Sequence, residues 1–156
     1  MIYIAHRGLI DGPDKGKENN PKQIQYAVSQ GFECEVDFWV VNHTIGPRFY
    51  LGHDYPQYVI EHDFILNYPL WIHAKNIQAL HWLVNLSQKH SGLKYFWHQE
   101  DDYTLTSNGL IWTYPGKNLT PQSICVMNGL EYVDPPEVPV WGICSKFVSS
   151  IKKNTK

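Results

Sequence analysis

At 156 residues the chain is long enough for one domain with a single sizeable core, and too short for two. Its apolar fraction of 43%, with 14% aromatic residues, excludes the aromatic-poor composition of disordered chains. The formal net charge is -2, and no basic cluster occurs outside the last few residues, so we expect no nucleic-acid partner.

Cysteine usage and the first residues of the chain bear on the cell compartment. Cys34, Cys125 and Cys144 form an odd set, and each lies inside an apolar or strand-like run. This arrangement is typical of reduced cytosolic thiols rather than of a disulfide framework. Residues 1–5 enter a strand without the regions of a signal peptide, and no apolar run approaches membrane-spanning length. We therefore expect a cytoplasmic protein without a membrane partner.

The predicted elements are eight strands and two helices. The first helix follows Asn20 as the N-cap and Pro21 at the first helical position, and it ends at Gly31. The second is predicted over residues 76–90, with Gly92 beyond its end. The predicted strands cover residues 2–6, 32–41, 48–53, 70–75, 94–99, 109–114, 123–127 and 138–144.

Eight strands with helices in some crossovers favour a parallel α/β fold, because parallel neighbours need a crossover connection. A (β/α)8 barrel typically needs about 200 residues or more. Several connections are too short for full helices: residues 42–47, 100–108, 115–122 and 128–137. We therefore predict one domain over residues 1–156, a small TIM-like (β/α)8 barrel with several outer helices trimmed to loops. An α+β domain with a mixed sheet is the alternative.

The first predicted strand ends in His6-Arg7-Gly8, at the end of the strand that carries reactive groups in parallel α/β folds. The planar fork of Arg7 suits the oxygens of a phosphate, and His6 can exchange a proton near neutral pH. A structural histidine beside a surface arginine is the more common meaning of such a tripeptide taken alone.

The second predicted strand alternates strictly over residues 32–38, which puts Glu33, Glu35 and Asp37 on one face. Three carboxylates in a row repel each other unless a cation lies among them. Such oxygen ligands suit Mg²⁺ or Ca²⁺. The alternative is a solvated face on an edge strand. An apolar continuation over residues 39–41 favours the buried cation site.

Two further strands end in residues of the same chemical kind. The third is followed by Gly52-His53-Asp54, which gives a second histidine at a strand end. In the fourth, His73 and Lys75 share a face, and Lys75 is a second candidate cation for a phosphate. Each residue alone is more often structural, but their joint appearance at successive strand ends indicates a site.

Two aromatic segments further along the chain are candidates for substrate binding. Residues 96–102 contain His98 and Glu100, and residues 111–116 contain Trp112. Aromatic faces stack on apolar sugar or glycerol surfaces, and His98 can hydrogen-bond hydroxyl groups. Plain core packing is the alternative for both segments.

The motifs together resemble a known family. His6-Arg7-Gly8, then Glu18-Asn19-Asn20-Pro21 opening a helix, then Glu35-x-Asp37 and Gly52-His53-Asp54, occur in the order and approximate spacing of the N-terminal signature of glycerophosphodiester phosphodiesterases. A fainter likeness continues through the lysine of the fourth strand and through residues 142–147. The chain is therefore similar to a short form of this family, within the phospholipase-C-like phosphodiesterases.

The resemblance implies a TIM-like barrel and a metal-dependent hydrolase of small-molecule phosphodiesters in lipid metabolism. It implies that His6 and His53 serve as general acid and base and that Glu35 and Asp37 bind a divalent metal, Mg²⁺ or Ca²⁺. It further implies the remaining roles: phosphate contacts by Arg7 and Lys75, and orientation of Arg7 or the metal shell by Glu18.

The sequence departs from the family at one metal position. The third metal carboxylate of the family lies two residues before the lysine, and this position is His73 here. A histidine ligand can shift the preference towards Mn²⁺ or Zn²⁺, or Glu33 or Glu100 can supply the missing oxygen, or metal binding is weakened.

Two other functions stay open at this point. A binding protein for a phosphate or phosphosugar would keep the site without efficient catalysis. A phospholipase would need an exposed apolar rim or a membrane-binding helix, and the sequence contains neither beyond a short basic end. The missing outer helices would leave apolar surface that a homo-oligomer can cover.

Overall fold

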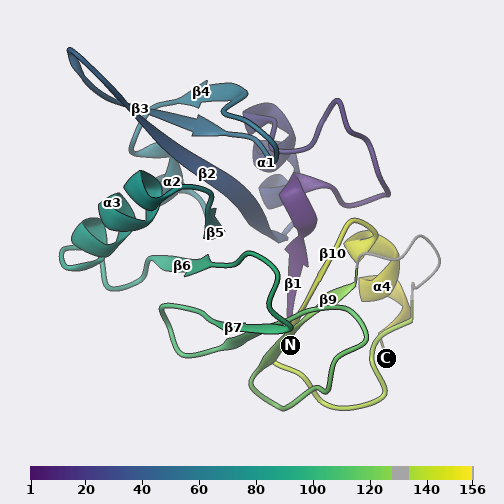
Figure 1. Ribbon diagram of the computed structural model, residues 1–156. Coiled ribbons are helices and arrows are strands. Elements are labelled where there is room, and N and C mark those ends of the chain that lie inside the picture. The colour runs from purple at the N-terminus through teal and green to yellow at the C-terminus, as the bar shows by residue number, and fades with distance from the viewer. Residues whose placement is uncertain (128–133, 156) are drawn as a thin grey trace.

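The computed structural model describes residues 1–127 and 134–155. In this part of the chain ten strands form one mixed sheet, accompanied by four helices and a 3₁₀ turn, η1 (His6–Gly8) (Figure 1). The strands are β1 (Ile2–Ala5), β2 (Glu33–His43), β3 (Gly46–Leu51), β4 (Tyr58–Ile60), β5 (Leu70–Ala74), β6 (Lys94–Trp97), β7 (Tyr103–Leu105), β8 (Ile111–Thr113), β9 (Ser123–Met127) and β10 (Gly142–Ser145). The helices are α1 (Pro21–Ser29), α2 (Phe64–Asn67), α3 (Ile77–Ser87) and α4 (Val148–Asn154).

The parallel part of the sheet runs in the order β6-β5-β2-β1-β10-β9-β8. Its strands therefore end at a common edge, which brings their carboxyl-terminal residues together. The antiparallel strands extend this part. Strands β3 and β4 continue from β2 as a meander, and β7 pairs with β8.

Two apolar clusters hold the sheet. The larger cluster lies between the sheet and its helices and includes Ile24 of α1 and Leu83 of α3, both fully buried. The smaller cluster contains strand and loop residues alone: Ile4, Trp71, Phe96, Leu110, Trp112, Ile124, Val126 and Cys144. The ring centroids of Phe96 and Trp112 lie 4.5 Å apart, so β6 and β8, the two ends of the parallel run, pack on each other. The sheet thus curves around this second cluster.

Both predicted helices are confirmed, and their starts follow local chemistry. The Asn20 side chain accepts a hydrogen bond from the Lys22 amide and caps α1, with Pro21 at the first position. The Asn76 side chain caps α3 in the same way by accepting from the Ala79 amide. Helix α3 ends at Ser87, slightly before the predicted position.

The predicted TIM-like (β/α)8 barrel is wrong, and the mixed sheet of the alternative describes the molecule. Helices precede only β2, β5 and β6 within the described residues, and a fourth follows β10. Part of the 128–137 connection lies outside the described residues. The main reason is the turn at residues 44–45, which reverses the chain so that β3 pairs antiparallel with β2. A reversal of this kind needs no crossover helix. Strands β4 and β7, which the sequence did not indicate, pair antiparallel as well.

Among the described residues, none of the helices combines the length and the apolar character required to cross a bilayer.

Substitution of Trp71 tests the contribution of the smaller apolar cluster to stability. Its side chain is 1% exposed, its indole nitrogen donates to Glu33 Oε2 over 2.6 Å, and the Lys94 ammonium lies 4.6 Å from the ring centroid. We expect Trp71→Ala to lower the free energy of unfolding by about 3–5 kcal/mol, because a large cavity opens between strands. Urea denaturation measures this change. Trp141, which is 51% exposed, is the control. Its alanine variant should stay within about 0.5 kcal/mol of the wild type. Equal effects of the two substitutions would contradict the assignment of Trp71 to the core.

Candidate functional site

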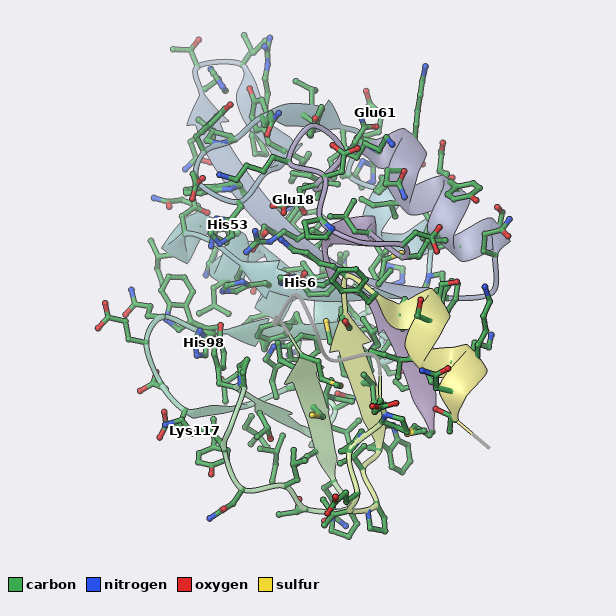
Figure 2. All side chains as sticks on the ribbon, turned by 90° about the vertical axis from the view of Figure 1, so that its right-hand side faces the viewer. His6, Glu18, His53, Glu61, His98 and Lys117 are labelled. Atoms are coloured by element: carbon green, nitrogen blue, oxygen red, sulfur yellow. The ribbon has the colours of Figure 1, made fainter. Side chains whose placement is uncertain are left out.

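The candidate site lies at the carboxyl ends of β1 and β5 and beside the segment of β2 that pairs with β5. His6 and Arg7 follow β1 directly, Glu35 and Asp37 lie in β2, and His73 lies in β5. Figure 2 shows His6 just beyond the ends of β9 and β10, with Glu18 and His53 on one side of it. The parallel register pairs Asp37 with His73, which sets these two side chains beside each other. Residues far apart in the chain therefore meet at one edge of the sheet.

Arg7 has an unusual backbone conformation that serves the site. Its φ of 55° lies in the left-handed region, which is uncommon for a residue with a side chain. In this conformation its amide donates to Glu35 Oε2 over 3.1 Å. Its guanidinium donates from Nη1 to Glu18 Oε2 over 2.7 Å, and its Nε lies 3.2 Å from Asp37 Oδ2. Arg7 thus connects three carboxylates.

The carboxylate of Asp37 is the most strongly contacted group of the site. It is 1% exposed, and His73 Nδ1 donates to its Oδ1 over 3.0 Å, with Lys75 Nζ 3.5 Å from the same oxygen. On the other oxygen, Asn19 Nδ2 donates over 2.9 Å beside Arg7. Burial opposes ionisation, but the His73 hydrogen bond and the charges of His73, Arg7 and Lys75 outweigh it. They hold the pKa of Asp37 well below its usual range.

The pKa of Glu35 shifts in the opposite direction from that of Asp37. Its side chain is buried, and it has the Arg7 amide as its hydrogen-bond donor. Burial and the nearby Asp37 charge raise the pKa of Glu35 to about 8, and the charges of Arg7 and Lys75 offset only part of this. Without a bound cation, Glu35 is therefore largely neutral at pH 7.

His6 is a buried and neutral imidazole. Burial, followed by the charge of Arg7, lowers its pKa to about 3. Its Nε2 lies 3.7 Å from Glu35 Oε2, and its Nδ1 has no hydrogen-bond partner among the described residues. A buried polar atom of this kind is costly unless a ligand or water contacts it. His6 is therefore neutral at neutral pH and has no imidazolium proton to supply.

Glu18 connects Arg7 to a lysine that the sequence analysis did not select. Its Oε1 accepts from Lys146 Nζ over 2.5 Å, and its Oε2 accepts from Arg7. Although burial opposes it, these two hydrogen bonds and charges lower the pKa of Glu18. The contact that the family resemblance implied between Glu18 and Arg7 is present. Lys146 follows β10 as His6 follows β1, and this position after a strand was the available signal.

Asn19 is the second residue that the sequence analysis missed. Its fully buried side chain accepts from the Asp37 amide over 2.8 Å and donates to the Asp37 carboxylate. Its φ of 59° is also positive, which asparagine tolerates better than most residues. The available signal was its place in the Glu18-Asn19-Asn20-Pro21 motif, directly before the helix cap Asn20.

His53 lies at the rim, since it follows the antiparallel strand β3. Its side chain is 39% exposed, and its Nδ1 lies 2.7 Å from Asp54 Oδ1. Gly52 holds this turn in place. Its amide donates to the Asp37 carbonyl over 3.0 Å, and a Cβ at its φ of 154° would clash with the Tyr55 carbonyl.

One cavity of about 210 Å³ joins these groups. His6 and His53 line it. The other lining residues are Arg7, Glu35, Asp37, His73, Phe96, Trp112, Tyr114 and Val126. Its polar residues lie in η1, β2 and β5 and after β3, and its aromatic floor lies on β6 and at β8. The two residues predicted to bind substrate, Trp112 and His98, differ in position. Trp112 forms part of the floor, stacked on Phe96, whereas His98 does not line the cavity.

His98 contacts two residues that line the cavity, His73 and Tyr114. Its Nε2 donates to the Asp101 carbonyl over 2.6 Å, so its Nδ1 accepts from the Tyr114 hydroxyl over 2.8 Å. Its own carbonyl accepts from His73 Nε2 over 3.0 Å. With both ring nitrogens occupied, His98 orients His73 and Tyr114 rather than offering a free group to a substrate.

A buried triad of Glu35, Asp37 and His73 can hold a metal ion. One ligand atom of each lies within 4.8 Å of the other two. The two ring nitrogens of His73 face the Asp37 carboxylate and the His98 carbonyl. A metal would take the place of the Nδ1 hydrogen, and the bond from Nε2 to the His98 carbonyl would keep the ring oriented. The donor set of two carboxylates and one imidazole fits a divalent ion.

Neither of the other two acidic residues considered as ligands joins the triad. Glu33 lies at the start of β2, where Lys94 Nζ donates to it over 2.5 Å and Trp71 donates as well. Glu100 is exposed in the loop after β6. His73 therefore remains as the candidate third ligand.

Comparison with protein-family models, with characterised proteins and with solved structures finds no match for this chain. The likeness to glycerophosphodiester phosphodiesterases consequently stands on the residues of the motifs alone.

The raised pKa of Glu35 predicts a pH-dependent stability. Because the folded pKa, about 8, lies above the ordinary value of 4.5, the neutral form contributes stability below pH 4.5 that is lost as the pH rises through 8. Glu35→Gln cannot ionise. In metal-free buffer its stability relative to the wild type should increase across this range, by up to about 1.4 kcal/mol per pH unit. Urea denaturation from pH 4 to 9 measures the difference.

Glu100→Gln is the control for this comparison, because Glu100 is exposed and lies outside the triad. Its pH profile should match the wild type. A Glu35→Gln profile parallel to the wild type would show that Glu35 is already ionised in the folded protein.

Proposed function

We propose that the protein is a metal-dependent phosphodiesterase that hydrolyses a glycerophosphodiester or a related small-molecule phosphodiester. The observation that supports this most is the single cavity that joins Glu35, Asp37 and His73 to Arg7 and two histidines. A metal triad, a phosphate-binding cation and a pair of proton-transfer groups are the components that this reaction requires. The motif resemblance supports the same reaction.

Electrostatics favour an anionic substrate. With Glu35 neutral, positive charges outnumber negative ones in and beside the cavity. Arg7 and Asp37 line it, Lys75 lies 3.5 Å from Asp37, and Glu18 contacts both Arg7 and Lys146. Arg7 contacts Glu18 through Nη1 and lies beside Asp37 through Nε, which leaves the Nη2 hydrogens for phosphate oxygens. Lys75, 3.5 Å from Asp37, is the second phosphate contact.

Glu35, Asp37 and His73 would hold the divalent ion. Carboxylate oxygens favour Mg²⁺ or Ca²⁺, while the His73 nitrogen extends the range to Mn²⁺ and Zn²⁺. When bound, the ion polarises the phosphoryl oxygens and neutralises charge in the transition state.

The two histidines divide the proton transfers according to their surroundings. His6 is buried and neutral, so its free ring nitrogen is assigned the proton of the attacking hydroxyl, which belongs to water or to a neighbouring group of the substrate. His53 lies at the rim, with Asp54 Oδ1 2.7 Å from its Nδ1. It donates the proton to the leaving alcohol as the bond from phosphorus to that oxygen breaks. With water as the nucleophile the products are a phosphomonoester and an alcohol; with a substrate hydroxyl, the alcohol and a cyclic phosphodiester form first, and water then opens the ring to the phosphomonoester.

Alanine variants of the histidines test this mechanism. His6→Ala and His53→Ala should each lower kcat by about 10²-fold or more, since each removes a general acid or base. Initial rates with a panel of glycerophosphodiesters and Mg²⁺, Mn²⁺, Ca²⁺ or Zn²⁺ measure the loss. His81, exposed on α3, provides the control, and His81→Ala should keep the wild-type rate. Wild-type turnover in either cavity variant would rule out the assigned roles.

Metal affinity should increase with pH up to about 8, because the ion must displace the proton of Glu35. We expect about a tenfold or greater gain per pH unit below this value. Titration calorimetry with Mn²⁺ in two buffers of different ionisation enthalpy measures both the affinity and the protons released. An affinity that is constant from pH 6 to 8, without proton release, would contradict a neutral Glu35.

A binding protein for phosphate or phosphosugars is the second candidate function. Its support is that His73, Lys75 and Arg7 already neutralise Asp37 without a metal. Such a protein would bind glycerol 3-phosphate in the presence of a chelator and would hydrolyse no diester with any metal. The panel described above separates the two functions.

A further inference from the structure

A second cavity of about 430 Å³ opens directly beside the candidate site. Arg7 and His53 line both cavities, so the two spaces meet at these side chains. The other lining residues of the second cavity are Lys15, Glu18, Asp54, Tyr55, Gln57 and Lys146. Figure 2 shows Glu18 and His53 on the same side of His6, where this opening lies.

The first cavity is too small for a whole phosphodiester substrate. Ligand sites usually enclose about 300–1,000 Å³, whereas the first cavity measures about 210 Å³. A phosphate beside Arg7 would therefore extend part of the substrate past His53 into the second cavity. Because His53 is the proposed proton donor to the leaving oxygen, this part is the leaving alcohol.

Within the part of the chain that the structure describes, one cation that lines the second cavity has no carboxylate partner. Glu18 is shared by Arg7 and Lys146, at 2.7 and 2.5 Å. Asp54 faces His53 at 2.7 Å. Lys15 has no ion-pair or hydrogen-bond partner among the described residues, although Lys17 in the same loop pairs with Asp14 at 3.0 Å. The free ammonium of Lys15 thus faces a space that the substrate would enter.

We propose that the second cavity binds the leaving alcohol and selects alcohols that carry a second negative charge, a carboxylate or a phosphate. This inference rests on the proposed function for its catalytic part. The phosphodiester group would lie against Arg7, and the second anionic group against Lys15. Water adds to phosphorus, the bond to the alcohol oxygen breaks, and the alcohol leaves with the proton from His53 and with its anionic group intact.

Three glycerophosphodiesters with different alcohols test the selection: glycerophosphoserine, glycerophosphoglycerol and glycerophosphocholine. We expect the highest kcat/KM for glycerophosphoserine, because it alone bears an added carboxylate. Lys15→Ala should lower kcat/KM for this substrate about fivefold, the effect of one solvent-exposed charge pair, and should leave glycerophosphocholine nearly unchanged. Added salt should weaken the wild-type preference, because it screens exposed charges.

Lys17→Ala is the matched control, since Lys17 lies in the same loop but its charge is paired with Asp14. This variant should keep the wild-type order of substrates. If Lys15→Ala lowers kcat/KM equally for all three alcohols, or for none, the proposed selection is wrong while the phosphodiesterase activity stands.

A binding measurement tests the cavity without catalysis. The probes are 3-phosphoglycerate and glycerol 3-phosphate, which share a phosphate and a carbon skeleton but differ in a carboxylate. Titration calorimetry with a chelator should show about fivefold tighter binding of 3-phosphoglycerate by the wild type and by Lys17→Ala, and equal binding by Lys15→Ala.

The two experiments separate the two proposals. Absence of turnover for every diester and metal would overturn the phosphodiesterase, and a Lys15-dependent preference for 3-phosphoglycerate would still support the anion-selective cavity. Equal binding of the two probes by the wild type would overturn that cavity whatever the activity.

Discussion

The arrangement of the site depends on one buried carboxylate, that of Asp37. Donors from three separate parts of the chain converge on it: Arg7 after β1, Asn19 before α1, and His73 with Lys75 at the end of β5. An ionised carboxylate this deeply buried is tolerated only when such partners surround it. The same contacts fix Arg7 and His73 in position, and the Asp37 backbone holds Asn19 and Gly52. Asp37 therefore both stabilises the local backbone and positions the charged side chains of the site.

Glu35 and Asp37 differ in ionisation because their surroundings differ. Asp37 attracts the cations and stays ionised, whereas Glu35 receives a single backbone donor and retains its proton at neutral pH. The surplus positive charge then favours a phosphate before a metal binds. An ion that displaced the Glu35 proton and the His73 Nδ1 hydrogen would leave the triad with two negative charges and a neutral imidazole. Under the proposed function, anion binding and metal binding would be coupled through these protons.

The scaffold explains why the two histidines differ. His6 ends a parallel strand in the middle of the sheet and is buried by its neighbours, while His53 ends an antiparallel strand at the rim. A full set of crossover helices was not needed, because the curved sheet packs Phe96 of β6 against Trp112 of β8 and fills its own interior. The antiparallel extension of β2 thus places the His53 side chain beside solvent, next to the second cavity.

Local chemistry in the sequence determined the helix caps at Asn20 and Asn76 and the alternation that puts Glu35 and Asp37 on one face, because these depend on near neighbours. Strand direction was decided by tertiary structure, since a turn at residues 44–45 and a crossover helix leave similar patterns of apolar residues in the strands they join. The tertiary structure also decided which residues distant in the chain contact each other. Lys146 meets Glu18, and the His98 ring turns away from the cavity, through packing that single-residue patterns do not carry.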